Sequence, residues 1–428
     1  MNSISLNKIS KVSGRVSVPG SKSLSNRALL MSALSRGRTT LFNILKSDDT
    51  ARMVDALKAL GVKVGMRGSS CDVTGLGHAF ATGLEPLTLD LGNAGTAMRP
   101  LCAALAFSDG VYTLTGDKRM FERPIGPLAE ALKSLGIHID YLNNSGFPPV
   151  RIRGGSPERH ELEVDGSLSS QFITALLIAA PLCGGLTVRV RGELISRPYV
   201  DLTVSLMERF GVKVQRKGYS EFTVPEGAAY VSPHSCLIEG DATAATYFAA
   251  AAAVAGEVEI YGIGKESVQG DAKFFEILER MGAKVSWSDH SVTVKHGKGL
   301  CGISIDMNSM PDAAMTLVPL ALYTSSPVTV TNIASWRVKE TDRIEAMAAE
   351  MRKLGVKVES GADWISVDAC ERNDEVPVFD TYNDHRMAMC MSLCAFDRDI
   401  VINDPECVNK TFPNYFKELL SVSQSAWN

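Results

Sequence analysis

The sequence predicts an α/β fold of six repeated units, divided between two domains of three units each. Two interlocking repeats lead to this prediction. Six apolar stretches follow one another at steps of 70 to 74 residues, and a charged or polar residue stands at the start of each: Arg27, Arg99, Gln171, Asp241, Asp312 and Arg386. A short amphipathic segment that ends in glycine recurs five times: Gly61, Gly136, Gly211, Gly282 and Gly355. Six such units exceed what one hydrophobic core holds, which favours two domains.

The apolar stretches are expected to be buried helices. Runs such as PLCAALAF and FITALLIAA are apolar on every side, which is typical of a helix without a solvent-facing surface. The first turn of a helix has unpaired N–H groups and the positive end of the helix dipole. Lys, Arg and hydroxyl residues at such positions therefore predict binding of an anion.

The glycine-ended segments are expected to be exposed helices, each followed by a strand. Glycine after a helix whose last turn carries Lys or Arg is a C-cap signal, and β-branched runs such as Val62–Val64 follow. One unit thus contains a buried helix, an exposed helix, and strands between and after them.

The chain termini predict that one domain is discontinuous. The sixth exposed helix, near Tyr415–Val422, has no strand after it, and the segment Gly14–Val18 is a strand without a preceding helix. We expect this N-terminal strand to complete the sixth unit. The domains are then 1–20 with 240–428, and 21–239, joined by a two-strand hinge near Gly20 and Ser232–Ser235. The alternative is a single solenoid of six units, which is disfavoured because solenoid helices are rarely apolar all round.

Composition excludes several classes of protein. The 428 residues are 45% apolar and 7% aromatic, and the net charge of −4 argues against general nucleic-acid binding. No apolar run is long enough to span a membrane, and the first residues lack a signal region. The nine cysteines form no Cys-x-x-Cys pair, and no His, Cys or carboxylate grouping has metal-ligand spacing. We therefore expect a cytoplasmic protein with no metal, no cofactor and no membrane partner.

Three segments of the first half are candidate anion sites. In Pro19–Arg27, Lys22 and Arg27 precede a buried helix, although the spacing does not fit a Walker A motif. Gly92–Arg99 has two glycines that allow a ligand close to the backbone, and this segment alone fits a tight turn equally well. Asp165–Gln171 has more hydroxyl groups than capping requires.

The second half contains the most unusual segment, Ser335–Arg343. Asp342 and Glu345 have the spacing of a capping box, so a helix is expected to begin there. Cations at that helix end are unfavourable unless an anion joins them. Asp312 and Glu340 could form an acid–base pair, whose pKa values burial would raise and nearby cations would lower. The sequence leaves open which effect is larger.

Five motifs resemble those of the 5-enolpyruvylshikimate-3-phosphate synthase family of enolpyruvyl transferases. They are PGSKSLSNR, GNAGTAMRP, DGSLSSQF, WRVKETDR and NDHRMAM, in the family's order and over nearly the whole chain. The resemblance implies two domains of three βαβαββ units, with buried helices inside and sheets outside (an inside-out α/β barrel), and an active site in the cleft between them. It also implies transfer of the enolpyruvyl group of phosphoenolpyruvate to the 5-hydroxyl of shikimate 3-phosphate, with release of phosphate, in aromatic amino acid biosynthesis.

The resemblance also implies the site residues. Shikimate 3-phosphate is expected to contact Ser23, Arg27, Ser169, Ser170, Ser196, Tyr199, Asp312, Ser335 and Lys339. Phosphoenolpyruvate is expected to contact Lys22, Gly95, Arg123, Gln171, Arg343, His385, Arg386 and Lys410. Arg386 is ranked above His385, because a lone His at a helix start is usually a cap or a core group. The family often has Asn where this chain has Ser335, so one hydrogen bond to shikimate 3-phosphate is in doubt. The inhibitor glyphosate occupies the phosphoenolpyruvate site in this family, and Gly95 with Pro100 resembles the sensitive type.

The resemblance also implies a mechanism. Glu340, assisted by Lys22, is expected to protonate the methylene carbon of phosphoenolpyruvate, and Asp312 is expected to accept the proton of the attacking hydroxyl. The sequence leaves open whether the acid and base roles of Glu340 and Asp312 are partly exchanged.

Two alternative functions remain. The sister family, UDP-N-acetylglucosamine enolpyruvyl transferase, relies on a Cys in a loop that corresponds to Asp117–Arg123, where this chain has none. A non-catalytic phosphosugar-binding protein would avoid carboxylates among its cations. By resemblance, the chain is expected to be a monomer.

Overall fold

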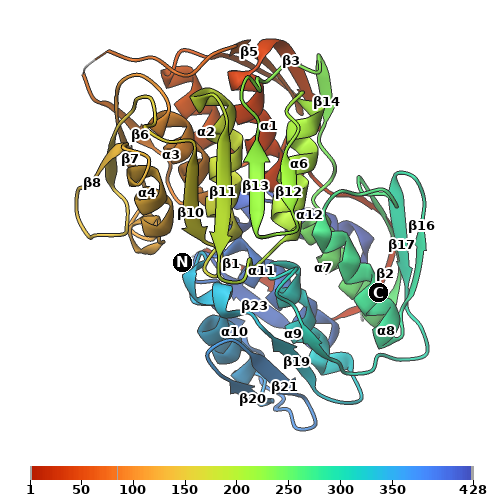
Figure 1. Ribbon diagram of the computed structural model, residues 1–428. Helices are drawn as coiled ribbons and strands as arrows, with labels where there is room; N and C mark the ends of the chain where they lie inside the picture. The colour runs from red at the N-terminus through yellow and green to blue at the C-terminus, as the bar shows by residue number, and fades with distance from the viewer. Residues whose placement is uncertain (1, 84, 426–428) are drawn as a thin grey trace. The chain divides into compact units, whose positions relative to one another are not determined.

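The chain divides into two compact units in the computed structural model, which describes residues 2–83 and 85–425 (Figure 1). Unit 1 consists of Met1–Pro19 with Glu239–Asn428, and unit 2 of Gly20–Ile238. Each unit has a continuous hydrophobic core of its own. Each is therefore described by itself.

Unit 2 contains three four-stranded sheets with one common topology. Their orders are β14-β3-β5-β4, β6-β7-β9-β8 and β10-β11-β13-β12. In each sheet the first pair is parallel and the others are antiparallel. The strands are β3 (Arg36–Phe42), β4 (Lys63–Arg67), β5 (Ser70–Leu76), β6 (Leu87–Asp90), β7 (Val111–Thr115), β8 (His138–Tyr141), β9 (Val150–Arg153), β10 (Glu161–Asp165), β11 (Leu186–Arg191), β12 (Gln215–Lys217), β13 (Glu221–Val224) and β14 (Ser235–Leu237).

The helices of unit 2 alternate between buried and amphipathic, as the repeat predicts. The buried helices are α1 (Lys22–Leu34), α3 (Gly95–Ala106) and α5 (Ser170–Ala179), the last continued by η2 (Ala180–Cys183). The amphipathic helices are α2 (Asp48–Ala59), α4 (Gly126–Lys133) and α6 (Pro198–Arg209), and η1 (Met120–Glu122) precedes α4. The buried helices contact one another, α1 with α3 and α3 with α5, and β11 and β13 lie in front of them in Figure 1. Parallel strands such as β6 and β7 need a crossover helix, and α3 provides it.

Unit 1 repeats this plan with three further sheets. Their orders are β16-β17-β15-β2-β24, β18-β19-β21-β20 and β1-β23-β22. The strands are β1 (Ser3–Leu6), β2 (Ile9–Ser17), β15 (Gly256–Tyr261), β16 (Lys284–Trp287), β17 (Ser291–Lys295), β18 (Ser304–Asp306), β19 (Val328–Thr331), β20 (Lys357–Ser360), β21 (Ile365–Asp368), β22 (Val378–Phe379), β23 (Ile400–Asn403) and β24 (Ser423–Ser425). None of the six sheets closes into a barrel within the described residues.

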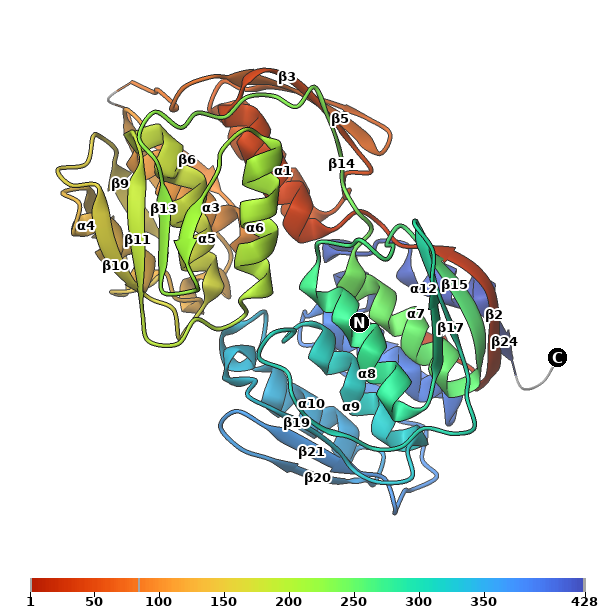
Figure 2. The ribbon, with the colours of Figure 1, turned by 45° about the vertical axis from the view of Figure 1, so that its right-hand side comes forward.

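The helices of unit 1 include its buried, alanine-rich helix α7 (Ala242–Ala255), which packs against β2, β15 and β17 (Figure 2). The other helices are η3 (Gly270–Lys273), α8 (Phe274–Met281), η4 (Ala313–Thr316), α9 (Leu317–Leu320), η5 (Ala321–Tyr323), η6 (Ala334–Val338), α10 (Arg343–Arg352), α11 (His385–Met391), η7 (Ser392–Phe396), η8 (Pro405–Lys410) and α12 (Tyr415–Val422). Among the described residues, none of the helices combines the length and the apolar character that crossing a membrane requires.

The five predicted glycine C-caps are confirmed. All five glycines have φ between 76° and 115°, the left-handed region that glycine enters without strain. At Gly61 the N–H donates to the Lys58 carbonyl at 3.0 Å, and the N–H of Val62 donates to the Leu57 carbonyl at 3.0 Å. This pair of bonds is a Schellman motif, which ends the helix and turns the chain into the next strand.

Two details of the predicted strand arrangement are wrong. The segment Gly14–Val18 does not complete the sixth unit, because β2 pairs in parallel with β15 of the fourth unit. The preceding strand, β1, pairs with β23 of the sixth unit instead. A strand also follows the sixth exposed helix, since β24 comes after α12 and pairs with β2.

The fifth apolar stretch is not a regular helix. It consists of η4, α9 and η5 in succession. Pro319 lies within α9. Proline has no N–H to donate, and its ring collides with the carbonyl group four residues earlier, so the α-helical ladder is interrupted here.

Candidate active site

A cluster of cations and carboxylates lies at the helix starts of unit 1, and Arg343 is its centre. The Arg343 side chain is 1% exposed and is the first residue of α10. Its guanidinium donates from Nε to Asp384 Oδ2 at 2.7 Å, from Nη1 to Asp312 Oδ1 at 2.9 Å and from Nη2 to Glu340 Oε2 at 2.9 Å. The cations predicted to crowd this helix start are thus balanced by carboxylates of the chain itself.

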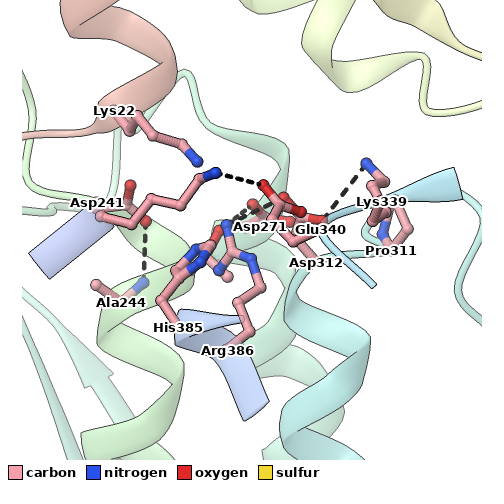
Figure 3. A network of polar contacts seen from close by, with 12 residues as sticks. Lys22, Asp241, Ala244, Asp271, Pro311, Asp312, Lys339, Glu340, His385 and Arg386 are labelled. Atoms are coloured by element: carbon pink, nitrogen blue, oxygen red, sulfur yellow. Dashed lines mark hydrogen bonds and ion pairs between the residues drawn. The ribbon is translucent and has the colours of Figure 1, made fainter. Parts of the chain in front are cut away.

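Arg386 converges on the same carboxylate from the first turn of α11. Its Nη2 donates to Asp312 Oδ2 at 3.0 Å and its Nη1 to the Tyr247 hydroxyl at 3.3 Å. The backbone N–H of Arg386 donates to Asp384 Oδ1 at 2.9 Å, so Asp384 both caps α11 and binds Arg343. Figure 3 shows Asp312 and Glu340 close to His385 and Arg386.

Two lysines complete the cluster. Lys339 Nζ lies 3.5 Å from Asp312 Oδ1, and Lys410 Nζ lies 3.4 Å from Glu340 Oε1. Lys410 ends η8, which begins after Asp404 in a left-handed conformation (φ 47°). Asp312 therefore faces two guanidinium groups and one ammonium group, and Glu340 faces one of each.

These cations decide the pKa of Asp312, which the sequence left open. Burial alone would raise the pKa of the Asp312 carboxyl, but Arg386, Lys339 and Arg343 together hold it well below its usual range. Burial likewise opposes the charge of Arg343, yet Asp384, Glu340 and Asp312 raise its pKa. At neutral pH Asp312 is an ionised carboxylate in a strongly positive environment.

A further buried carboxyl, Asp271, has the opposite character. It is 7% exposed in η3, and its Oδ2 accepts a hydrogen bond from the Thr243 hydroxyl at 2.6 Å. Burial raises the pKa of Asp271 to about 6, with Asp312 contributing to the rise and the Thr243 hydroxyl and Arg386 opposing it. The site thus contains two carboxyl groups whose environments shift their pKa values in opposite directions.

Unit 2 has a separate group of cations, at the starts of its own helices. Arg27, in α1, is 5% exposed and donates from Nε to the Thr203 hydroxyl at 2.8 Å and from Nη1 to the Ser23 carbonyl at 2.9 Å. Burial lowers the pKa of Arg27 to about 10, and Tyr199 opposes that shift. Lys22, the first residue of α1, lies 3.4 Å from Asp49 Oδ2.

The start of α3 brings two guanidinium groups against one glycine. Arg123 donates from Nη1 to the carbonyl and the side-chain oxygen of Asn93, at 2.9 and 2.8 Å. A Cβ atom on Gly95 would lie 2.7 Å from Arg123 Nη2 and 2.9 Å from Arg99 Nη1. Only glycine at this position leaves both groups where they are.

The remaining predicted residues of unit 2 lie at the starts of α5 and α6. Ser169 caps α5, where its hydroxyl accepts the N–H of Gln171 at 3.2 Å, and Ser170 is the first helical residue. Ser196 is left-handed (φ 53°) just before α6, and Tyr199 is the second residue of that helix.

Direct contacts thus join six predicted residues of unit 1: Asp312, Lys339, Glu340, Arg343, Arg386 and Lys410. Of the other two, His385 contacts Asp384, and Ser335 lies in η6. Within unit 2, direct contacts join Arg27 to Ser23, and Arg123 lies against Gly95.

Asp384 and Asp271 are not among the site residues predicted from the sequence. Asp384 stands inside the quoted motif NDHRMAM, at the position where an Asp before a helix is a capping signal, and that signal could have identified it. Asp271 has no comparable signal. In the described part of the chain, no group of three or more His, Cys, Asp or Glu side chains is placed to hold a metal ion.

Comparison with known proteins gives one consistent answer. Residues 6–419 match the family model of EPSP synthase (3-phosphoshikimate 1-carboxyvinyltransferase). Relatives named 3-phosphoshikimate 1-carboxyvinyltransferase include those of Tolumonas auensis, 50% identical, and Aeromonas salmonicida, 51% identical. Each alignment covers 99% of this chain and all of the relative.

Solved structures confirm the fold class. An EPSP synthase from Acinetobacter baumannii superposes with a TM-score of 0.81 at 24% identity over 99% of both chains. The enolpyruvyl transferase NikO from Streptomyces tendae superposes with a TM-score of 0.76 at 16% identity, over 98% of this chain and 97% of that one. The family model and the curated relatives extend over almost the entire chain, which belongs to the EPSP synthase family of enzymes.

Proposed function

We propose that this enzyme transfers the enolpyruvyl group of phosphoenolpyruvate to the 5-hydroxyl of shikimate 3-phosphate and releases phosphate, by addition followed by elimination. The family description and the names of the relatives support this reaction, which belongs to the shikimate pathway of aromatic amino acid biosynthesis. Both substrates carry several negative charges, and the cations at the helix starts of both units match them.

One observation carries the proposal: two guanidinium groups converge on a single carboxylate. Arg343 and Arg386 contact the two oxygens of Asp312 at 2.9 and 3.0 Å. A planar guanidinium is well suited to a carboxylate, and the same two groups can take the carboxylate of phosphoenolpyruvate. Lys410, Lys22 and Arg123 are then the proposed partners of its phosphate, with Gly95, Gln171 and His385 beside it.

Shikimate 3-phosphate is proposed to bind mainly to unit 2. Arg27 is already ordered by Thr203 and by the Ser23 carbonyl, so little side-chain entropy is lost when it binds an anion. The proposed contacts in unit 2 are Ser23, Arg27, Ser169, Ser170, Ser196 and Tyr199. Those proposed in unit 1 are Asp312, Ser335 and Lys339.

Glu340 is the proposed acid of the addition step. It delivers a proton to the methylene carbon of phosphoenolpyruvate, with assistance from Lys22, while the 5-hydroxyl oxygen forms a bond to the neighbouring carbon. The product of this step is a tetrahedral adduct that still carries the phosphate. In the elimination step Glu340 takes a proton back from the new methyl group, the carbon–oxygen bond to phosphate breaks, and the enol ether forms. The departing phosphate takes up the proton that Asp312 removed from the 5-hydroxyl, which returns both carboxyl groups to their starting states. Arg343 and Lys410 contact Glu340 and stabilise its ionised form between the two steps.

Asp312 is the proposed base for the 5-hydroxyl. Its low pKa makes it a weak base while Arg343 Nη1 and Arg386 Nη2 both donate to it. When the carboxylate of phosphoenolpyruvate binds these two groups, they share their hydrogen bonds between two anions. The pKa of Asp312 then rises, and the base becomes stronger only when the donor substrate is present.

The two alternatives are less well supported. The segment Asp117–Arg123 forms a short turn around η1 and has no Cys, which the sister family requires. A protein that only binds phosphosugars would not be expected to place a carboxylate beside its cations. Glu340 is a buried carboxylate that contacts both Arg343 and Lys410, so it competes with a bound phosphate for these two groups.

The test is release of phosphate from phosphoenolpyruvate with shikimate 3-phosphate, with UDP-N-acetylglucosamine, and without acceptor. We expect release with shikimate 3-phosphate alone, in a one-to-one ratio to its consumption. Release with UDP-N-acetylglucosamine would assign the chain to the sister activity. Binding of both anions without release would make it a binding protein.

We also propose that glyphosate occupies the phosphoenolpyruvate position and that the enzyme is sensitive to it, since Gly95 and Pro100 are both present. Inhibition competitive with phosphoenolpyruvate is the expected result. We further propose that the enzyme is a monomer and is located in the cytoplasm. The elution volume of the purified chain on gel filtration tests the monomeric state.

A further inference from the structure

A second buried carboxylate on α10 lies outside the proposed catalytic cluster. Glu350 is fully buried. Its Oε1 accepts the Tyr382 hydroxyl at 2.6 Å, and its Oε2 accepts the Asp380 N–H at 2.9 Å and lies 2.7 Å from Lys353 Nζ. We call these four residues the Glu350 network. A buried charge is costly to keep, and an apolar residue of similar size would stabilise a helix face at least as well.

The network holds a strained turn. Tyr382 and Asn383 both have φ of 53°, a region that non-glycine residues seldom occupy. Asn tolerates this conformation, but Tyr gains nothing from it locally. Such strain persists only where the surrounding contacts determine the conformation. Here Glu350 binds the Asp380 N–H and the Tyr382 hydroxyl, on either side of Thr381, and these two contacts fix the conformation of the turn.

The strained turn leads directly into the proposed site. The next residue, Asp384, binds Arg343 and caps α11, and Arg386 follows in the first turn of that helix. Arg343 and Glu350 are seven residues apart on α10, which places them on the same face about two turns from each other. One helix therefore holds both the central guanidinium and the turn that presents Asp384 and Arg386.

We propose that Glu350 and Tyr382 are positioning residues for Arg386, and that they set the affinity for phosphoenolpyruvate. This inference rests on the proposed function. Helix α11 is already capped by Asp384, so the Glu350 network is not needed to begin the helix. The Glu350 network instead fixes the direction in which the turn leaves β22, and this direction sets the position of the Arg386 guanidinium.

The test uses Tyr382→Phe, which removes one hydroxyl group from a partly exposed ring. Tyr219→Phe is the matched control, because the Tyr219 hydroxyl donates to the Asp201 carboxylate at 2.7 Å in unit 2. We expect Tyr382→Phe to raise KM for phosphoenolpyruvate about tenfold, with kcat and KM for shikimate 3-phosphate within about twofold. The control should leave both KM values unchanged. Glu350→Gln, which keeps one acceptor oxygen, should shift KM for phosphoenolpyruvate in the same direction.

Amide hydrogen exchange provides a readout that does not depend on activity. In Tyr382→Phe the Arg386 N–H, which donates to Asp384, should exchange faster than in the unmodified chain, while the control leaves it unchanged. Unchanged exchange together with an unchanged KM in Tyr382→Phe would overturn the inference, as would equal rises in both KM values. If the unmodified chain releases no phosphate, the proposed function fails, and the exchange result still decides whether Tyr382 positions Arg386.

Discussion

Replacing Gly95 by Ala should weaken binding of phosphoenolpyruvate without destabilising the fold. The new Cβ atom would lie 2.7 Å from Arg123 Nη2, where ordinary contacts begin at 3.4 Å, so the guanidinium must move by about 0.7 Å. Arg123 is held at 2.8 and 2.9 Å by Asn93, and a movement of that size lengthens both hydrogen bonds beyond their normal range. Displacement of a substrate-binding group by about 1 Å can cost about a hundredfold in rate. We therefore expect KM for phosphoenolpyruvate to rise at least tenfold.

The free energy of unfolding of Gly95→Ala should stay unchanged or rise slightly. Gly95 is the first residue of α3 and has no positive φ, so Ala introduces no backbone strain there, and its advantage over Gly is smaller than the roughly 1 kcal/mol found in helix interiors. Steady-state kinetics and thermal unfolding of the same preparations separate the two effects. Gly155→Ala is the matched control, since nothing lies within 4 Å of its added Cβ. An unchanged KM for phosphoenolpyruvate in Gly95→Ala would refute the reasoning, and a large fall in Tm would show that the backbone, not Arg123, had moved.

Glu340→Gln and Asp312→Asn should each bind both substrates yet lose at least about a hundredfold in kcat, measured by phosphate release. The control Glu345→Gln, in the exposed part of α10, should keep its rate. Near-normal turnover of Glu340→Gln or Asp312→Asn would exclude the role assigned to that carboxylate. Arg343→Lys should lower the free energy of unfolding in urea by about 3 kcal/mol or more, because a lysine cannot reach three carboxylates at once, and a loss below about 1 kcal/mol would contradict the central place of this residue. Asp271→Asn should change how stability depends on pH. The folded-state pKa of Asp271 is raised from 3.8 to about 6, so the native chain holds a proton that the unfolded chain has lost, and stability from this group is present below about pH 4 and lost as pH rises through 6. The unfolding free energy of the variant should therefore exceed that of the unmodified chain by up to about 3 kcal/mol at pH 7, but not at pH 4; equal curves would refute the raised pKa of Asp271.

Local signals explain why much of the fold could be predicted from the sequence. A glycine C-cap depends on one residue and the helix before it, and each of the five was identified correctly. Burial of the six apolar stretches follows from their composition alone. Pro319 was a local sign of irregularity in the fifth stretch, but Pro100 lies within the continuous helix α3, so proline alone does not locate such a break.

Pairing between distant segments could not be predicted in the same way. The segments β1 and β2 follow each other closely near the N-terminus, and nothing local indicates that β1 joins β23 while β2 joins β15. The choice depends on which sheet edge each strand reaches in the folded unit. A repeat pattern indicates where strands recur inside the chain, but it missed β24 and does not give the partner of a terminal strand.

The site shows the same division. The motifs located Arg343 and Arg386, and the start of the fifth apolar stretch located Asp312, but none of these signals indicated that all three would be linked by direct contacts. The pKa of Asp312 depends on distances between side chains from three separate segments, and those distances exist only in the folded chain. Asp271 could not be predicted, because its raised pKa results from burial, and no neighbouring residue in the sequence indicates that burial.

We propose that Lys22 of unit 2 and Arg386 of unit 1 bind the same molecule of phosphoenolpyruvate. Calorimetric titration of phosphoenolpyruvate in the presence of shikimate 3-phosphate tests it, in an Asp312→Asn background where turnover should be at least about a hundredfold slower. We expect Lys22→Met and Arg386→Met each to weaken phosphoenolpyruvate binding at least tenfold, with affinity for shikimate 3-phosphate within about threefold. Undiminished phosphoenolpyruvate binding by either variant would contradict the account.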